Sequence, residues 1–300
     1  MCEQYEQVLQ VLPVKRRQQA ALVPQHQQEQ CEELRLRFGQ PMSLLIQEEE
    51  ISVGDEPVSM QELEQVLEVA SRASVHTVLE QIRQGFLTLD GGHRMGICGT
   101  VTVQNGKVEQ VQWLSSLSIR IARSIRGAAA PVYKKLLRPD RTLYSTLIVS
   151  PPGYGKTTLL RDLIRMAASG EGMCPQRVGI ADERGELAAL RQGKPQQDVG
   201  WLSDVMDGCP KGLAAMLLLR AMNPQILAMD EITASEDVEA MVQACGCGVT
   251  LLSTAHGRDK QDLCSRPLYK ILLEQHIFER FVFISKEQGK RVYRVEEMWE

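Results

Sequence analysis

The sequence predicts an α/β protein whose main domain is built on a parallel sheet and is preceded by a smaller α+β domain. Three observations lead to this fold class. A buried strand, a glycine-containing loop and a helix follow one another over residues 147–166. Further apolar strands alternate with helices after that stretch, which is typical of parallel sheets. Before residue 125, short segments of alternating hydrophobicity surround one amphipathic helical stretch.

The loop at 150–158 is the most informative stretch of the chain. It ends in Gly-Lys-Thr between an apolar strand and a predicted helix over Thr157–Met166, the context of a phosphate-binding loop. Backbone N–H groups of such a loop and of the first helical turn converge on phosphate groups. Lys156 would reach the β- and γ-phosphates, and the Thr157 hydroxyl would ligate Mg²⁺. We therefore expect a nucleotide to bind here.

The loop departs from the usual pattern at its first position, where Ser150 stands in place of glycine. Pro151 and Pro152 have no N–H group, so the phosphate cradle must come from Gly153 through Thr158. The predicted nucleotide-contacting residues are Ser150, Pro151, Pro152, Gly153, Tyr154, Gly155, Lys156, Thr157 and Thr158.

Composition narrows the function classes. A chain of 300 residues suggests roughly two domains. Its net charge, 34 − 38 = −4, gives no general attraction to nucleic acid. Eight scattered cysteines without a signal peptide fit a reducing cytosol, and Cys245 and Cys247 are interpreted as a helix end rather than a metal site. No apolar run reaches the roughly 18 residues of a membrane span.

The first 125 residues are predicted to form the α+β domain. A short helix over Glu3–Leu12 is followed by two extended segments, Glu33–Phe38 and Leu44–Ile46. A capping-box pattern at 59–62 begins a long amphipathic helix that we expect to reach Gln84. An antiparallel meander follows, with a hairpin turn at 105–106. Residues 126–141 carry basic residues and one acid, and are predicted to be a linker before the domain at 142–300.

Acidic residues follow two of the predicted parallel strands. The strand at 226–229 runs directly into Asp230 and Glu231, where Asp230 would hold Mg²⁺ through water and Glu231 would polarise the attacking water. The strand at 178–181 runs into Asp182 and Glu183. Acids at the carboxyl ends of parallel strands lie at the ligand edge of an open sheet. A last strand at 249–254 places His256 at the same edge, where it would sense the γ-phosphate.

Several motifs together resemble the stage III sporulation protein AA family over roughly residues 85–284. They lie at 94–99, 118–123, 150–162, 182–186, 204–211, 230–232 and 254–257. That family is similar to the type II and type IV secretion ATPases, which include pilus motors. The resemblance implies a RecA-like P-loop ATPase core in a ring-shaped homo-oligomer, expected to be a hexamer, that hydrolyses ATP with Mg²⁺.

The resemblance also assigns roles. Glu183 matches the acidic box of secretion ATPases and His256 matches their histidine box. It leaves open whether Glu231 or Glu183 is the main base. It further implies a cytoplasmic protein on the mother-cell side of the outer forespore membrane, which energises a channel complex of membrane-embedded proteins.

Two other function classes remain open at this point. One is a nucleic-acid motor of the RecA or helicase type, disfavoured by the acidic balance. The other is a nucleotide-dependent scaffold with little turnover, disfavoured by the complete set of Mg²⁺ and base candidates. A cation for the developing γ-phosphate charge is still missing from the predicted site. We expect Arg120 or Arg123 to supply it to a neighbouring subunit, since both lie at the domain junction.

Overall fold

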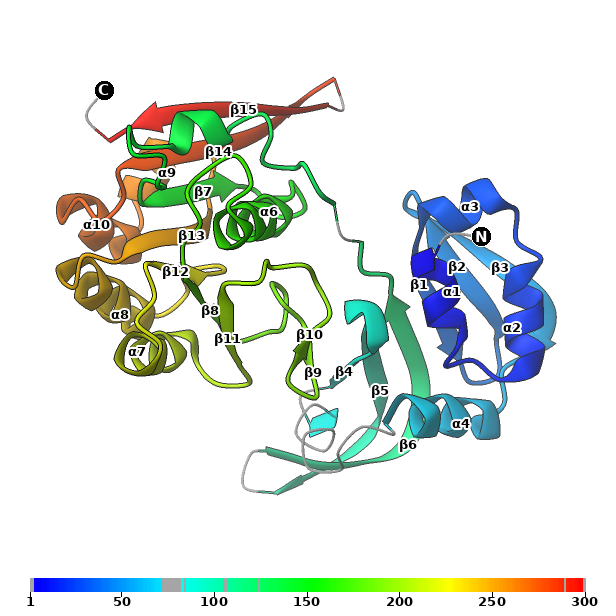
Figure 1. The fold of residues 1–300 in the computed structure, drawn as a ribbon. Coiled ribbons are helices and arrows are strands. Elements are labelled where there is room, and N and C mark those ends of the chain that lie inside the picture. Colours follow the sequence, from blue (N-terminus) through cyan, green and yellow to red (C-terminus); the bar gives the residue numbers. More distant parts are fainter. Residues whose placement is uncertain are drawn as a thin grey trace. The chain divides into compact units, whose positions relative to one another are not determined.

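The computed structural model describes residues 3–71, 82–83, 85–104, 107–123, 125–288 and 290–298 (Figure 1). The chain forms two compact units. Unit 1 comprises Met1–Arg123 together with the short segment Leu190–Gln196, and unit 2 comprises Ser124–Ala189 and Gln197–Glu300. Each unit has its own sheet and its own hydrophobic core.

Unit 1 is built on a six-stranded antiparallel sheet with the strand order β3-β2-β1-β6-β5-β4. Its strands are β1 (Cys31–Arg37), β2 (Pro41–Ile46), β3 (Glu49–Pro57), β4 (Phe86–Thr88), β5 (Arg94–Gln104) and β6 (Lys107–Arg120). Its helices are α1 (Glu3–Leu9), α2 (Val14–Ala21), α3 (Gln25–Gln30) and α4 (Met60–Ser71). The small hairpin of β9 (Leu190–Arg191) and β10 (Lys194–Pro195) also belongs to unit 1, where Arg191 pairs with Asp90.

A buried arginine ties the helices of unit 1 together. Arg16 on α2 is 1% exposed, and its guanidinium donates to both carboxylate oxygens of Glu62 on α4 and to the carbonyls of Glu56 and Pro57. A buried charge is costly unless it is paired and hydrogen-bonded, and this one is both. Glu62 also completes the predicted capping box, because it accepts from the Ser59 N–H while its own N–H donates to the Ser59 hydroxyl.

The α+β class predicted for the first domain is confirmed, and β4, β5 and β6 form the predicted antiparallel meander. β6 also pairs with β1, which joins this meander to the three early strands in one open sheet. Helices α2 and α3 were not predicted, because their polar, glutamine-rich sequences lack a clear apolar stripe. Most of the predicted continuation of the 59–84 helix beyond Ser71, and the turn at 105–106, lie outside the described residues.

Unit 2 contains a seven-stranded sheet with the order β11-β8-β12-β13-β7-β14-β15. Six strands are parallel, and β15 runs antiparallel to β14. The strands are β7 (Thr146–Ser150), β8 (Val178–Asp182), β11 (Ser203–Asp207), β12 (Ile226–Met229), β13 (Thr250–His256), β14 (Arg280–Glu287) and β15 (Lys290–Glu297). The helices are α6 (Lys156–Ser169), α7 (Lys211–Ala221), α8 (Ser235–Gly246), α9 (Lys260–Cys264) and α10 (Pro267–Glu274).

Helices cover both faces of this sheet. Alternate residues of β7, Leu147 and Val149, share a core with α7, α8 and α10, and α6 lies on the opposite side (Figure 1). All residues of β7, β8 and β12 are buried, as expected for parallel strands covered on both faces. The predicted α/β class with a parallel sheet is therefore confirmed. The carboxyl ends of β7, β8, β12 and β13 meet at one edge, which is the usual ligand edge.

The basic segment 126–141, predicted to be a linker, packs within unit 2. Ala129, Val132 and Leu136 are buried, and the Ala129 N–H donates to Asp162 on α6 at 2.8 Å. Arg138 forms an ion pair with Glu279. The apolar residues interleaved with the basic ones anchor the segment to the core of unit 2. Among the described residues, no helix combines the length and the apolar character needed to cross a membrane.

Candidate functional site

The loop after β7 has the backbone of a phosphate cradle. Gly153 and Gly155 have φ angles of 75° and 97°, a left-handed conformation that glycine adopts without steric cost. Gly155 is also the N-cap of α6, so the first N–H groups of the helix face the same side as the loop. Ser150 ends β7 and is not among the residues with positive φ, so the backbone there does not require glycine. This explains why serine is tolerated at the first position of the motif.

Lys156 is folded back against the loop. Its Nζ donates to the carbonyls of Ser150 and Pro151 at 3.0 and 3.1 Å, and it lies 3.0 Å from Nδ1 of His256. The side chain is buried, and burial lowers the pKa of Lys156, while Asp230 and Glu231 act in the opposite direction. Phosphate oxygens would replace carbonyl oxygens as partners when an anion enters the loop.

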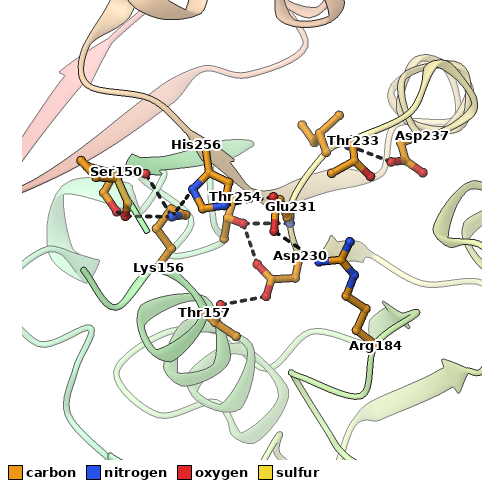
Figure 2. A network of polar contacts seen from close by, with 12 residues as sticks. Ser150, Lys156, Thr157, Arg184, Asp230, Glu231, Thr233, Asp237, Thr254 and His256 are labelled. Carbon is orange, nitrogen blue, oxygen red and sulfur yellow. Dashed lines mark hydrogen bonds and ion pairs between the residues drawn. The ribbon is translucent and has the colours of Figure 1, made fainter. Parts of the chain in front are cut away.

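His256 joins the loop lysine to the predicted base. A lysine ammonium can only donate, so Nδ1 of His256 accepts from Lys156 and the ring proton resides on Nε2. That Nε2 lies 3.0 Å from Oε1 of Glu231 and donates to it. Lys156, His256 and Glu231 therefore form one continuous chain of contacts across the edge of the sheet (Figure 2).

Asp230 and Thr157 lie close enough to share a cation. The Thr157 hydroxyl donates to Oδ2 of Asp230 at 2.8 Å, and the Thr254 hydroxyl donates to Oδ1 at 2.6 Å (Figure 2). A hydroxyl and a carboxylate are hard oxygen ligands of the kind that Mg²⁺ prefers. These two residues fit the predicted Mg²⁺ site, in which Thr157 and Asp230 would hold the ion beside the phosphates.

Glu231 is held in an unusual backbone conformation. Its φ is 45°, a region that residues other than glycine rarely adopt and that costs about 1–3 kcal/mol. Two contacts fix it, because its N–H donates to the Thr254 hydroxyl at 2.8 Å and its carbonyl accepts from Lys211 Nζ at 2.7 Å. Such strain is concentrated at functional positions, which supports a chemical role for Glu231.

These side chains share one cavity of about 430 Å³ in unit 2. The volume is within the range of small-ligand pockets. The sequence-predicted residues that line it are Pro152, Gly153, Gly155, Lys156, Thr157, Thr158, Asp230, Glu231 and His256, and Glu186, Thr254 and Arg291 line it as well. Ser150, Pro151 and Tyr154 do not line it. Ser150 and Pro151 act through their carbonyls on Lys156, and the Tyr154 ring faces Lys286.

Glu183 lies beside the main cavity. It lines a second cavity of about 20 Å³ together with Glu231 and Lys211, which is room for about one water molecule. The Glu183 carboxylate is 3.5 Å from the buried Lys211 ammonium. Both predicted base candidates therefore border the same small cavity, but of the two only Glu231 also lines the main cavity.

Asp182, the last residue of β8, has a structural role. It is 2% exposed, and its two oxygens accept from four backbone N–H groups, those of Glu186, Leu187, Ala188 and Ala189, at 2.8–3.3 Å. This carboxylate fixes the loop that carries Glu183, Arg184 and Glu186 to the site.

Arg120 and Arg123 have partners within unit 1. Arg120 donates to Glu33 at 2.9 Å, although its side chain is still 69% exposed. Arg123 donates to the Cys31 carbonyl at 2.9 Å. Their expected action on a neighbouring subunit stays a prediction.

Five residues of the site were not predicted from the sequence, and they are Lys211, Arg184, Arg291, Glu186 and Thr254. Lys211 is the last residue of the motif at 204–211, but the sequence indicated no role for it. Arg184 lies 3.9 Å from Glu231 and belongs to the 182–186 motif (Figure 2). Arg291 lines the main cavity from β15, and no motif surrounds it. The quoted motifs contain Lys211, Arg184, Glu186 and Thr254, so these residues had a signal in the sequence, whereas Arg291 depends on the path of the last two strands.

Comparison with known proteins shows the family to which this chain belongs. The model of a family described as "Sporulation stage III, protein AA" matches residues 2–297. Stage III sporulation protein AA of Bacillus subtilis (strain 168) is 35% identical over 284 residues, which cover 94% of this chain and 92% of that protein. Protein SEEDLING PLASTID DEVELOPMENT 1 of Arabidopsis thaliana is 26% identical over 174 residues, which cover 57% of this chain and 24% of that protein.

Solved structures with a similar fold include a pilus retraction motor and an ATPase. The pilus retraction motor PilT with bound ADP has a TM-score of 0.59 at 18% identity, covering 91% of this chain and 81% of PilT. The Legionella pneumophila ATPase DotB has a TM-score of 0.58 at 10% identity, covering 90% of this chain and 77% of DotB. At these identities the likeness concerns the fold alone, which this chain shares with PilT and DotB.

Proposed function

This chain belongs to the stage III sporulation protein AA family, and from that premise we propose that it is an Mg²⁺-dependent ATPase of the secretion-motor type. One observation carries the proposal. A single cavity is lined by a glycine-containing loop, a lysine, a Thr–Asp pair, a strained glutamate and a histidine, which lie at the ends of the three strands β7, β12 and β13. Each has the chemistry that phosphoryl transfer needs.

The residues would divide the work as follows. Backbone N–H groups from Gly153 to Thr158 would cradle the phosphates, and Lys156 would leave the carbonyls of Ser150 and Pro151 to contact phosphate oxygens. When bound at Thr157 and Asp230, Mg²⁺ would neutralise charge on the phosphate oxygens. Glu231 would accept the proton of the attacking water, since its carboxylate borders both cavities.

His256 would report on the state of the phosphates. In this structure it holds Lys156 on one ring nitrogen and Glu231 on the other. If Lys156 moves to a phosphate, the Nδ1 of His256 loses its donor and is free to respond to the γ-phosphate. The histidine thereby links occupancy of the loop to the position of the base.

The enzymatic proposal is tested by phosphate release from Mg²⁺-ATP. We expect the purified full chain to hydrolyse ATP and the Lys156→Ala variant to lose this activity while keeping its fold by circular dichroism. Lys270→Ala, an exposed lysine on α10, is the matched control and should hydrolyse ATP at the normal rate. Equal hydrolysis by the Lys156→Ala and control variants would overturn the assignment, and a folded wild-type protein that binds ATP without turnover would indicate a scaffold.

We further propose that the protein works as a homo-oligomeric ring, expected to be a hexamer, docked on a sporulation channel complex. Family membership and the secretion-ATPase fold support this proposal. Arg120 and Arg123 would then reach the nucleotide of a neighbouring subunit, and the 69% exposure of Arg120 leaves its guanidinium accessible. Particle mass with and without a non-hydrolysable ATP analogue tests the ring, since a mass of one subunit under both conditions would exclude it.

The proposed location is the mother-cell side of the outer forespore membrane, with the protein bound to membrane-embedded partners. The sporulation family supports this placement. Fractionation of sporulating cells provides the test. We expect the protein to sediment with membranes when the channel proteins are present and to remain in the soluble fraction when they are deleted; sedimentation independent of those proteins would contradict the docking proposal.

A further inference from the structure

The last two strands bring a hairpin beside the phosphate loop. β14 pairs in parallel with β7 only over Arg280–Phe283, whereas it pairs with β15 over its whole length. In the same register, residue 284 reaches the level of Ser150, and residues 285–287 continue past the carboxyl end of β7, where the phosphate loop begins (Figure 1). The end of this hairpin lies next to the loop rather than against the core.

Two cations of the hairpin lie against the loop. Lys286 and Arg291 are direct partners across the two strands, and directly opposed residues share one face of the ribbon. The Lys286 ammonium lies 4.8 Å from the centre of the Tyr154 ring. The guanidinium carbon of Arg291 lies 3.2 Å from the position that a Cβ on Gly155 would occupy. Glycine at this position therefore also leaves room for Arg291.

The two opposed cations of the hairpin, Lys286 and Arg291, would be stabilised by a nearby anion. Like charges directly opposite each other on a ribbon repel, so Lys286 and Arg291 would destabilise the hairpin end if nothing balanced them. Lys286 has the Tyr154 ring as a partner. Within the described part of the chain, no hydrogen bond or ion pair joins the Arg291 guanidinium to another residue, and this guanidinium faces the main cavity.

Arg294, on the same strand as Arg291, has partners for its charge within the fold. It donates to Glu296 at 2.9 Å and lies 5.0 Å from the centre of the Phe283 ring, so its charge is satisfied within the fold. Arg291 and Arg294 point to opposite faces of β15, because successive residues of a strand alternate. Only Arg291 lines the cavity that holds Lys156 and Thr157.

We propose that Arg291 contacts the phosphate chain of the bound nucleotide and is supplied by the same subunit, an inference that rests on the ATPase function proposed above. The residue beneath its guanidinium, Gly155, belongs to the part of the loop whose N–H groups face the phosphates. A guanidinium presents a planar fork of N–H donors that matches the spacing of phosphate oxygens. Aliphatic and neutral side chains lack this charged fork. The contact between Lys286 and Tyr154 holds the hairpin against the loop, so that Arg291 closes the cavity over the phosphates.

The test measures binding of two ligands by the full chain with Mg²⁺ present. Isothermal titration with ATP and with inorganic tripolyphosphate separates phosphate contacts from base contacts. We expect Arg291→Ala to weaken both by a similar factor of about 10- to 100-fold, the usual effect of removing a charged hydrogen bond. Arg291→Lys should recover part of the affinity, because it keeps the charge without the fork. Arg294→Ala, with the same loss of charge on the same strand, should bind both ligands normally.

Each other outcome is decisive. Unchanged binding of both ligands by a folded Arg291→Ala variant would overturn the inference while leaving the ATPase proposal intact. Weaker ATP binding with unchanged tripolyphosphate binding would show that Arg291 stacks on the base, which also contradicts the phosphate contact. If the wild-type protein binds neither ligand, the proposed function fails, and the inference fails with it. Thermal unfolding of each variant confirms that the fold is retained.

Discussion

Replacing Glu231 by glutamine should separate binding from hydrolysis. Glutamine has the same shape as glutamate and can still accept a hydrogen bond from Nε2 of His256, 3.0 Å away. The backbone of residue 231 is fixed by Thr254 and Lys211 through main-chain contacts that the substitution does not touch. The variant should therefore keep the geometry of the site and lose only the ability to accept a proton.

The size of the effect follows from that single loss. General-base assistance is worth about 10²- to 10⁴-fold in rate. At about 1.4 kcal/mol for each factor of ten, this corresponds to roughly 3–5 kcal/mol of transition-state stabilisation. Glu231→Gln removes a negative charge beside the cavity and so reduces the repulsion of the ATP phosphates. The affinity for ATP should therefore not fall. The Glu231→Gln variant should thus bind ATP at least as well as the wild type and hydrolyse it slowly.

The assay compares two glutamates that border the same small cavity. Single-turnover hydrolysis of radiolabelled ATP is measured for Glu231→Gln and for Glu183→Gln, with nucleotide binding measured in parallel. We expect a large rate loss for Glu231→Gln and a smaller one for Glu183→Gln. In the wild type, the Glu183 carboxylate is paired with Lys211 and does not line the main cavity. A near-normal rate for Glu231→Gln together with collapse of Glu183→Gln would refute this reasoning and identify Glu183 as the base.

Three further predictions concern other parts of the chain. Asp182→Asn should lower the free energy of unfolding by about 2–6 kcal/mol, measured in urea, because two of four buried N–H groups lose an acceptor at about 1–3 kcal/mol each; a loss below about 1 kcal/mol would contradict the role given to Asp182. Burial lowers the pKa of His93 to about 4 from the ordinary value of 6.5, so the unfolded chain takes up this proton first as the pH falls. The contribution of His93 to the free energy of unfolding should therefore be full above pH 6.5 and decline towards pH 4 by about 1.4 kcal/mol per pH unit. Urea titrations at several pH values measure this dependence, and His93→Asn should remove the part that His93 causes. A pH dependence that is the same in the variant would contradict the prediction. Mixed rings of Lys156→Ala subunits and Arg120→Ala/Arg123→Ala subunits should recover part of the ATPase activity that each lacks alone, and mixed rings without activity would show that the arginines do not act between subunits.

The phosphate site could be predicted from sequence because its parts are local. Gly153, Gly155, Lys156 and Thr157 lie within five successive positions, and their spacing alone defines the loop. Asp230 and His256 follow apolar strands, and the ends of parallel strands meet at one edge. These rules brought together residues that are about a hundred positions apart in the chain.

The contacts made through the fold could not be predicted in the same way. Asp182 ends β8 and Glu183 follows it, but the sequence does not reveal that the Asp182 side chain turns inward to four N–H groups while Glu183 borders the smaller cavity. Lys211 meets Glu231 only because α7 begins beside the end of β12. Arg291 depends on how far β14 runs past β7, which is a property of the sheet rather than of any motif.

A crystal structure with Mg²⁺ and a non-hydrolysable ATP analogue tests the central claim most directly. We predict that the phosphates lie against the N–H groups of residues 153–158 and that Lys156 Nζ leaves the carbonyls of Ser150 and Pro151 for phosphate oxygens. The metal should lie beside the Thr157 hydroxyl and Asp230, and Glu231 should face the γ-phosphate. A nucleotide bound outside this cavity, or a metal held away from Thr157, would contradict the assignment of this site.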